Sequence, residues 1–211
     1  MKSELKLPKL SYYRCIVRVT QIVCKKRVWP EADGAGCDSL KPIKADQLIV
    51  EILDLGSLES IRQFAAKVVQ NHPKMTTSIN NACPLWPRRD KYSTTKDGFE
   101  QTIGVNHLGH FLLTELLLPA IKAAAPSRII NVSSVAHKYG QRLLFGLLRP
   151  MTISAWEGAQ TTLYTVLMDS PTPGGYYSNC ALKAANRLVN DERERLWLWE
   201  KSCELVGLPK N

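Results

Sequence analysis

The 211-residue sequence lacks an apolar run long enough to cross a membrane. Its longest nearly apolar stretch covers residues 111–121 and is interrupted by Thr114 and Glu115, whereas a membrane-spanning helix needs about 20 apolar residues. No apolar segment follows the charges of the first residues, so we expect neither a signal peptide nor an N-terminal anchor. The sequence therefore predicts a cytoplasmic protein without a transmembrane segment.

Closely spaced cysteines are lacking as well. The six cysteines are scattered along the chain, and no two have the two-residue gap of a zinc or redox motif. A chain of this size does not need a disulfide framework to fold. We therefore expect reduced thiols, as in the cytosol.

The composition shows no bias that would exclude a globular fold. The hydrophobic content is 45% and the mean hydropathy is -0.17, as in ordinary globular proteins. The twelve glycines and twelve prolines form neither a collagen-like period nor a proline-rich linker. A chain of this length can bury one sizeable core.

Positive charge is in excess but is not concentrated. The net charge is +9, yet its densest clusters are only residues 25–27 and 88–89, and no nucleic-acid-binding motif surrounds either. Such charge supports weak, salt-sensitive association with polyanions, including anionic membrane surfaces. Nucleic-acid binding is not expected as the main function.

Strand-like and helix-like patterns alternate along the chain. The apolar, β-branched run at residues 48–55 predicts a buried parallel strand, and Ser57 is placed to cap a helix that residues 71–73 end. The further expected strands cover residues 75–82, 128–134 and 176–177, and the further helices 97–125, 157–168 and 191–205. This alternation is typical of a doubly wound parallel sheet with helices on both faces.

Polar residues stand at the predicted carboxyl ends of the strands, where such sheets bind ligands. They are Asp54, Asn80, Asn81, Ser133 and Ser134. We therefore look for the chemistry of the chain at these strand ends.

Four segments carry a resemblance to a known family. They are residues 53–55, 80–82, 104–111 and 130–137, and in this order they resemble the short-chain dehydrogenase/reductase family, with closest likeness to its retinol dehydrogenase branch. The resemblance is strong over residues 45–141 and moderate over 143–208. It implies one α/β domain with an incomplete Rossmann-like doubly wound parallel sheet. In that domain residues 1–45 are a divergent N-terminus, 46–141 the core and 142–211 a C-terminal segment.

The resemblance also implies cofactor-binding residues. Asp54 would accept a hydrogen bond from the adenine amino group, and the segment Asn80-Asn81-Ala82 would pass beside the cofactor ribose. Lys25 would match the basic residue that reads a 2′-phosphate, favouring NADP over NAD. The alternatives are a carboxylate at a helix N-terminus for Asp54 and a turn that satisfies its own main chain for the asparagines.

Two catalytic residues follow from the same resemblance. Ser134 would orient the substrate oxygen, and Asn106 would kink a helix and hold a water of the proton relay. Because Asn106 lies in an otherwise apolar helix, we also expect its side chain to have a buried hydrogen-bond partner. Simple structural polar roles are the alternatives. The family uses no metal, and the spacing of the histidines at positions 107, 110 and 137 fits no zinc site.

The sequence departs from the family in three places. Residues 1–45 hold no strand–glycine-loop–helix pattern of the kind that binds a pyrophosphate. Cys83 replaces the last residue of the family's Asn-Asn-Ala-Gly. The catalytic Tyr-x-x-x-Lys, whose spacing puts both side chains on one helix face, is missing, because Lys183 follows Asn179 and not a tyrosine by four residues. A join near residues 141–143 that skips the catalytic helix would explain this.

The resemblance implies an NADP(H)-linked oxidoreductase of retinoid-like or other apolar aldehydes and alcohols, impaired or inactive in this chain. The alternative is a catalytically dead interaction protein that forms homo- or hetero-oligomers with full-length relatives. A peripheral contact with the endoplasmic reticulum membrane is compatible with either function.

Overall fold

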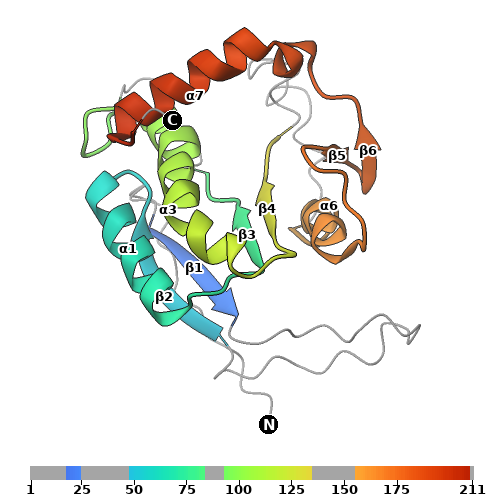
Figure 1. The fold of residues 1–211 in the computed structure, drawn as a ribbon, viewed down its shortest axis with the longest axis horizontal. Helices are drawn as coiled ribbons and strands as arrows, with labels where there is room; N and C mark the ends of the chain where they lie inside the picture. The colour runs from blue at the N-terminus through green and yellow to red at the C-terminus, as the bar shows by residue number, and fades with distance from the viewer. Residues whose placement is uncertain (1–17, 25–47, 84–92, 135–154, 210–211) are drawn as a thin grey trace. The chain divides into compact units, whose positions relative to one another are not determined.

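Strands and helices alternate along the chain in the computed structural model (Figure 1). The structure describes residues 18–24, 48–83, 93–134 and 155–209. The chain divides into two compact units. The first is made of Met1–Phe64 and Cys83–Gly109, and the second of Ala65–Ala82 and His110–Asn211.

The first unit contains an antiparallel pair of strands, β1 (Arg18–Cys24) and β2 (Leu48–Asp54). The prediction of a buried parallel strand at residues 48–55 was wrong in its direction of pairing and in its burial. Leu53 is buried, but Val50 and Ile52 are 63% and 72% exposed. Successive side chains of a strand point to opposite faces, and only the Leu53 face of β2 is covered.

Helix α1 (Leu58–Asn71) begins and ends where the sequence predicts. The Ser57 hydroxyl accepts a hydrogen bond from the Ser60 backbone N–H at 3.3 Å, as a helix cap should. Apolar residues at helical spacing are buried, among them Ile61, Phe64, Ala65 and Val68. The helix stops shortly before Pro73, which cannot continue it.

The predicted long helix is built from three consecutive pieces. They are α2 (Gln101–Ile103), the π-helix η3 (Gly104–Gly109) and α3 (His110–Lys122). The predicted start at residue 97 was four residues too early, because Thr94 pairs with Glu100 and Gly98 takes a φ of 84° in a turn. The Glu100 carboxylate caps the helix by accepting from the N–H groups of Thr102 and Ile103.

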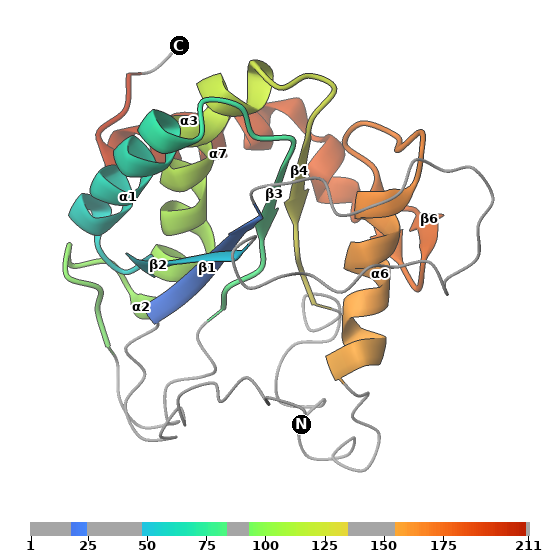
Figure 2. The same ribbon diagram turned by 90° about the horizontal axis from the view of Figure 1, so that it is seen from below.

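The second unit contains the parallel pair that the sequence predicts. Strands β3 (Thr77–Asn80) and β4 (Arg128–Asn131) pair with Ser78 beside Ile129 and Asn80 beside Asn131. Helices α3 and α6 (Ala155–Leu167) lie on opposite sides of this pair in both views (Figures 1 and 2). The Arg128 guanidinium donates to the carbonyls of Thr165 and Val166 and so ties β4 to α6. A parallel sheet with helices on both faces, incomplete in its strands, is the predicted fold class.

The C-terminal elements complete the second unit. They are β5 (Tyr176–Ser178), β6 (Ala181–Lys183), the 3-10 helix η5 (Arg187–Asn190) and α7 (Glu192–Val206). The predicted helices at residues 157–168 and 191–205 and the short strand are therefore confirmed. Asp191 caps the start of α7, and Gly207 ends it with a φ of 68°. No helix in the described ranges is long and apolar enough to span a membrane.

Candidate functional site

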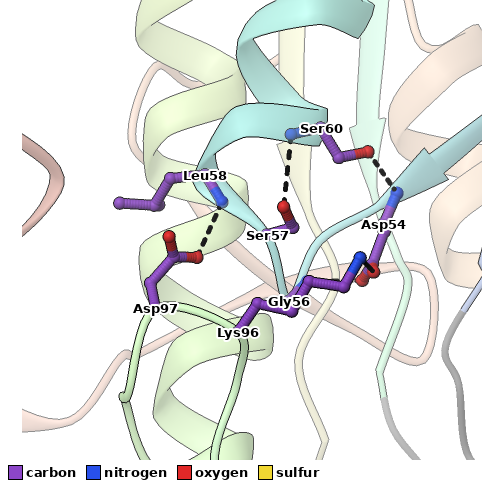
Figure 3. Close-up of polar contacts among 7 residues, drawn as sticks. All are labelled: Asp54, Gly56, Ser57, Leu58, Ser60, Lys96 and Asp97. Atoms are coloured by element: carbon purple, nitrogen blue, oxygen red, sulfur yellow. Dashed lines mark hydrogen bonds and ion pairs between the residues drawn. The ribbon is translucent and has the colours of Figure 1, made fainter.

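The turn between β2 and α1 is held together by Asp54 (Figure 3). One carboxylate oxygen, Oδ1, accepts from the Gly56 N–H at 3.0 Å, and the other, Oδ2, lies 3.0 Å from the Lys96 ammonium. The Asp54 N–H in turn donates to the Ser60 hydroxyl at 3.1 Å. Both oxygens of the predicted adenine-binding carboxylate are therefore engaged within the chain.

The loop before α2 also caps the N-terminus of α1. The Asp97 carboxylate accepts from the Leu58 N–H at 2.8 Å, and the Lys96 N–H donates to the Gly56 carbonyl at 3.0 Å (Figure 3). Free N–H groups at a helix N-terminus can bind a phosphate. Here the Leu58 and Ser60 N–H groups already have side-chain acceptors, so an anion would have to compete with Asp97 and Ser57 for them.

Sequence reasoning missed the roles of Lys96 and Asp97. The contact between Leu58 and Asp97 joins positions 39 residues apart, and no periodicity in the sequence signals it.

Lys96 also stands four residues after Tyr92, which formally gives the Tyr-x-x-x-Lys spacing. This lysine lies before the helix and is paired with Asp54, while Tyr92 lies outside the described residues. The spacing therefore does not supply the helix-borne catalytic pair.

The end of β3 is fixed by the side chain of Asn80. This residue is buried, and its amide Nδ2 donates to the Thr114 hydroxyl on α3 at 2.9 Å and to the Asn131 Oδ1 at the end of β4 at 2.7 Å. The predicted contact with the cofactor ribose would be made by the backbone of residues 80–82 and not by the Asn80 side chain. The side chain itself joins β3, β4 and α3.

His110, the first residue of α3, holds the segment that follows β3. Its Nε2 lies 2.8 Å from the Ala82 carbonyl oxygen, and since a carbonyl only accepts, Nε2 carries the proton. Burial lowers the pKa of His110, and the hydrogen bond to Ala82 partly opposes that shift. Burial likewise lowers the pKa of His107. The neutral ring of His110 therefore braces the chain just before Cys83.

Three buried polar atoms near this strand end have no hydrogen-bond partner in the described part of the chain. They are the Ser78 hydroxyl oxygen, the Asn80 Oδ1 and the His110 Nδ1. Buried polar groups are nearly always satisfied by protein or by ordered water. This strand end therefore has unused hydrogen-bonding capacity, in contrast to the end of β2.

Asn106 lies in the π-helix η3 and its side chain is exposed. The expectation of a buried partner for Asn106 was therefore wrong, because the π-turn faces this residue outward while Val105 and Leu108 are buried. A side chain at Gly109 would bring its Cβ within 2.5 Å of the Leu55 carbonyl oxygen. The π-helix thus packs backbone to backbone against the residue that follows β2.

The remaining predicted residues lie on the surface or outside the described ranges. Asn81, Cys83 and Ser134 are exposed, and Ala82 is half-buried. Ser134 follows β4 by three residues, because β4 ends at Asn131 and not at the predicted residue 134. Lys25 lies outside the described residues.

The predicted site residues are divided between the two units. Asp54 and Asn106 belong to the first unit, and the segment 80–82 and Ser134 belong to the second. The structure brings Asp54 together with Lys96, and Asn80 with Asn131. Among the residues it describes, no cluster of three metal-ligating side chains occurs.

Comparison with known proteins places these features in context. A family model described as short chain dehydrogenase matches residues 31–144. Human retinol dehydrogenase 12 is 32% identical over 246 aligned positions, which cover 84% of this chain and 76% of that protein. Human retinol dehydrogenase 13 is 58% identical over 92 positions, which cover 42% of this chain and 26% of that protein. An uncharacterized protein of Mycobacterium paratuberculosis has a similar structure, with a TM-score of 0.53, 27% identity and 75% of each chain covered.

Proposed function

Because this chain belongs to the short-chain dehydrogenase family, in its retinol dehydrogenase-like branch, we propose that it derives from an NADP(H)-linked oxidoreductase of retinoid-like aldehydes and alcohols and has lost most of the turnover. The oxidoreductase type rests on the family match and on the relatives. The cofactor preference, the substrate class and the loss of activity are the proposal.

The length of the alignments is the observation that carries the loss of activity. The match to retinol dehydrogenase 12 extends over 246 positions, more than the 211 residues of this chain. The relative therefore has residues with no counterpart here. We infer that these residues are missing near positions 141–143, so that the helix with the family's catalytic Tyr-x-x-x-Lys has no counterpart. In support, no tyrosine after Ser134 is followed by a lysine four residues later.

The missing pair matters for a specific proton. When a carbonyl is reduced, the hydride adds to the carbon and the oxygen must take up a proton. A tyrosine whose pKa is lowered by a lysine one helical turn away is the acid that the family resemblance implies. Ser134 could still orient the substrate oxygen, but a serine hydroxyl at its ordinary pKa is a poor acid. We therefore expect substrate binding to be retained better than the reduction of the carbonyl group.

The described residues fit the cofactor only in part. Asp54 offers a carboxylate at the carboxyl end of β2, but an adenine amino group would have to share it with Lys96. The Leu58 and Ser60 N–H groups at the start of α1 already have acceptors in Asp97 and Ser57, which would compete with a pyrophosphate. This supports weak binding of NADP(H).

The second candidate function is an interaction protein without catalysis. It is favoured by large apolar side chains that remain exposed on β2 and α7, among them Ile52 and Trp197. Such side chains in a monomeric domain mark contact surfaces when they form a patch. The two candidates differ in whether the chain binds a dinucleotide at all.

A titration with NADPH, followed through the fluorescence of the five tryptophans, separates these candidates. Saturable binding without retinal reduction supports the proposed function. The Lys96→Met variant should bind NADPH more tightly, because it frees the Asp54 carboxylate, whereas Lys67→Met, an exposed lysine on α1, is the matched control. Absence of any binding favours the interaction protein. Turnover at the rate of an intact retinol dehydrogenase would overturn both.

A further inference from the structure

The N-terminal half of α7 is largely exposed, although Trp199 packs edge-to-face against Phe111 of α3 with ring centroids 5.1 Å apart. Every residue from 192 to 200 is exposed, including the apolar run Leu196, Trp197, Leu198 and Trp199 at 55%, 60%, 46% and 42%. The last turns of the same helix, in contrast, bury Ser202, Cys203 and Val206. Large apolar side chains that stay exposed on the other faces of such a helix are expected to be covered by a partner.

One face of α7 has a distinctive order of charges. Glu194, Trp197, Leu198 and Lys201 stand at positions i, i+3, i+4 and i+7, and so share one face of the helix. With 100° per residue, this face points away from the buried Cys203 and Val206. An acidic residue therefore stands at one end of an apolar centre and a basic residue at the other.

We propose that this face, made of Glu194, Trp197, Leu198 and Lys201, binds the same face of a second copy of this chain. The two α7 helices run antiparallel about a two-fold axis that passes between Trp197 and Leu198. In this pairing Trp197 packs on the partner's Leu198, and Glu194 lies opposite the partner's Lys201. Each contact occurs twice, as two-fold symmetry requires.

The charges favour a second copy over other occupants of this face. A parallel pairing would place Glu194 against the partner's Glu194, which is repulsive. An anionic lipid surface would repel the same carboxylate. The antiparallel pair alone gives both charged ends an opposite charge. Lys201 already pairs with Glu204 of its own helix, and a second carboxylate from the partner extends that pair into a small network.

The interface rests on one helix pair and is therefore small. Stable protein interfaces bury about 1,200–2,000 Å² in total, more than two short helices provide. The exposed Leu188 and Val189 of η5, directly before α7, can add apolar area. The dimer is accordingly weak and reversible, so it forms and dissociates with chain concentration. It requires neither cofactor nor substrate, and its test is independent of the proposed function.

Sedimentation equilibrium of the full chain tests this pairing. The wild type should shift from monomer to dimer as its concentration rises. Glu194→Lys places lysine against lysine, and Lys201→Glu places glutamate against glutamate, so each variant alone should dimerise about tenfold or more weakly. In an equimolar mixture of the two variants every facing pair is again of opposite charge, and a heterodimer should form. Glu200→Lys makes the same charge change off this face and should dimerise as the wild type does.

Four results would overturn the proposal. The first is a wild type that stays monomeric at every concentration. The second is a dimer that both charge reversals leave intact. The third is a mixture of the two variants that forms no heterodimer although each keeps the helix content of the wild type by circular dichroism. The fourth is a monomeric wild type that binds phosphatidylserine vesicles through Trp197, because a lipid surface is then the occupant.

Discussion

The ends of β2 and β3 differ in how their polar groups are satisfied. At the end of β2, Asp54 uses both carboxylate oxygens within the chain, and the first N–H groups of α1 are capped by Ser57 and Asp97. At the end of β3, the buried Asn80 keeps an oxygen without a partner in the described residues, as does the hydroxyl of Ser78.

This difference determines how readily each strand end could accept a further polar group. A closed network such as that of Asp54 competes with any ligand for the same atoms. A network with unpartnered atoms, such as that of Asn80, can accept a hydrogen bond from a water or a further polar group. The end of β3 therefore has hydrogen-bonding capacity that the Asp54 carboxylate at the end of β2 already uses within the chain.

Gly109→Ala should have the largest effect on stability and tests the β2 side. The new Cβ would lie 2.5 Å from the Leu55 carbonyl oxygen, and a backbone atom cannot move aside as a flexible side chain can. We expect the free energy of unfolding to fall by about 3 kcal/mol, measured by urea denaturation. Gly174→Ala is a control for new bulk, since nothing lies within 4 Å of its added Cβ, although its positive φ adds some strain. Equal losses in the two variants would show that η3 is not packed against Leu55.

Asn80→Ala tests the β3 side and should cost about 2 kcal/mol. The variant removes the donor that binds Thr114 and Asn131 and leaves those two acceptors without it. Asn81→Ala, at the exposed neighbouring position, should leave the urea midpoint nearly unchanged. A comparable loss for both variants would contradict the bridging role of Asn80.

Asp97→Ala should cost about 1 kcal/mol, because it removes a side-chain acceptor from the first turn of α1. Lys96→Met breaks an exposed ion pair and should cost less, about 0.5 kcal/mol or below. The order of these two losses, read from urea midpoints, distinguishes helix capping from charge pairing. If Lys96→Met were the more damaging, the ion pair with Asp54 would be the main support of this turn.

The pH dependence should give the smallest effect. Burial lowers the pKa of His110 in the folded chain, so the unfolded chain binds its proton first as the pH falls below about 6.5. The free energy of unfolding should therefore decrease from about pH 7 to pH 5, with His107 adding in the same direction. His110→Gln keeps a donor for the Ala82 carbonyl and should flatten this decrease. A slope identical to that of the wild type would exclude His110 as its source.

Local patterns predicted the elements well. The capped helix after Ser57, the parallel strands around Asn80 and Asn131, and the C-terminal helix were all found close to their expected bounds. Each of these depends on capping, periodicity or strand propensity within a few residues. The pairing of β2 could not be predicted in this way, because a continuous apolar run does not reveal whether its neighbour is parallel or whether both faces are covered.

The site was predicted less well than the fold. The exposure of Asn106 follows from a π-turn between Gly104 and Gly109, which helical periodicity does not reveal. The engagement of Asp54 by Lys96 depends on a loop distant in sequence. The roles proposed for Asp54, Asn80, Asn81, Ala82, Asn106, Ser134 and Lys25 toward a cofactor or substrate remain predictions.

The loss of turnover can be measured as the rate of retinal reduction with NADPH. The purified chain and an intact retinol dehydrogenase would be assayed side by side at saturating NADPH, with the folded state of each confirmed by circular dichroism. Loss of the positioned acid predicts a rate that is undetectable or lower by a factor of about 10² to 10⁴. A rate close to that of the intact enzyme would show that another group supplies the proton, and would contradict the proposed loss of turnover.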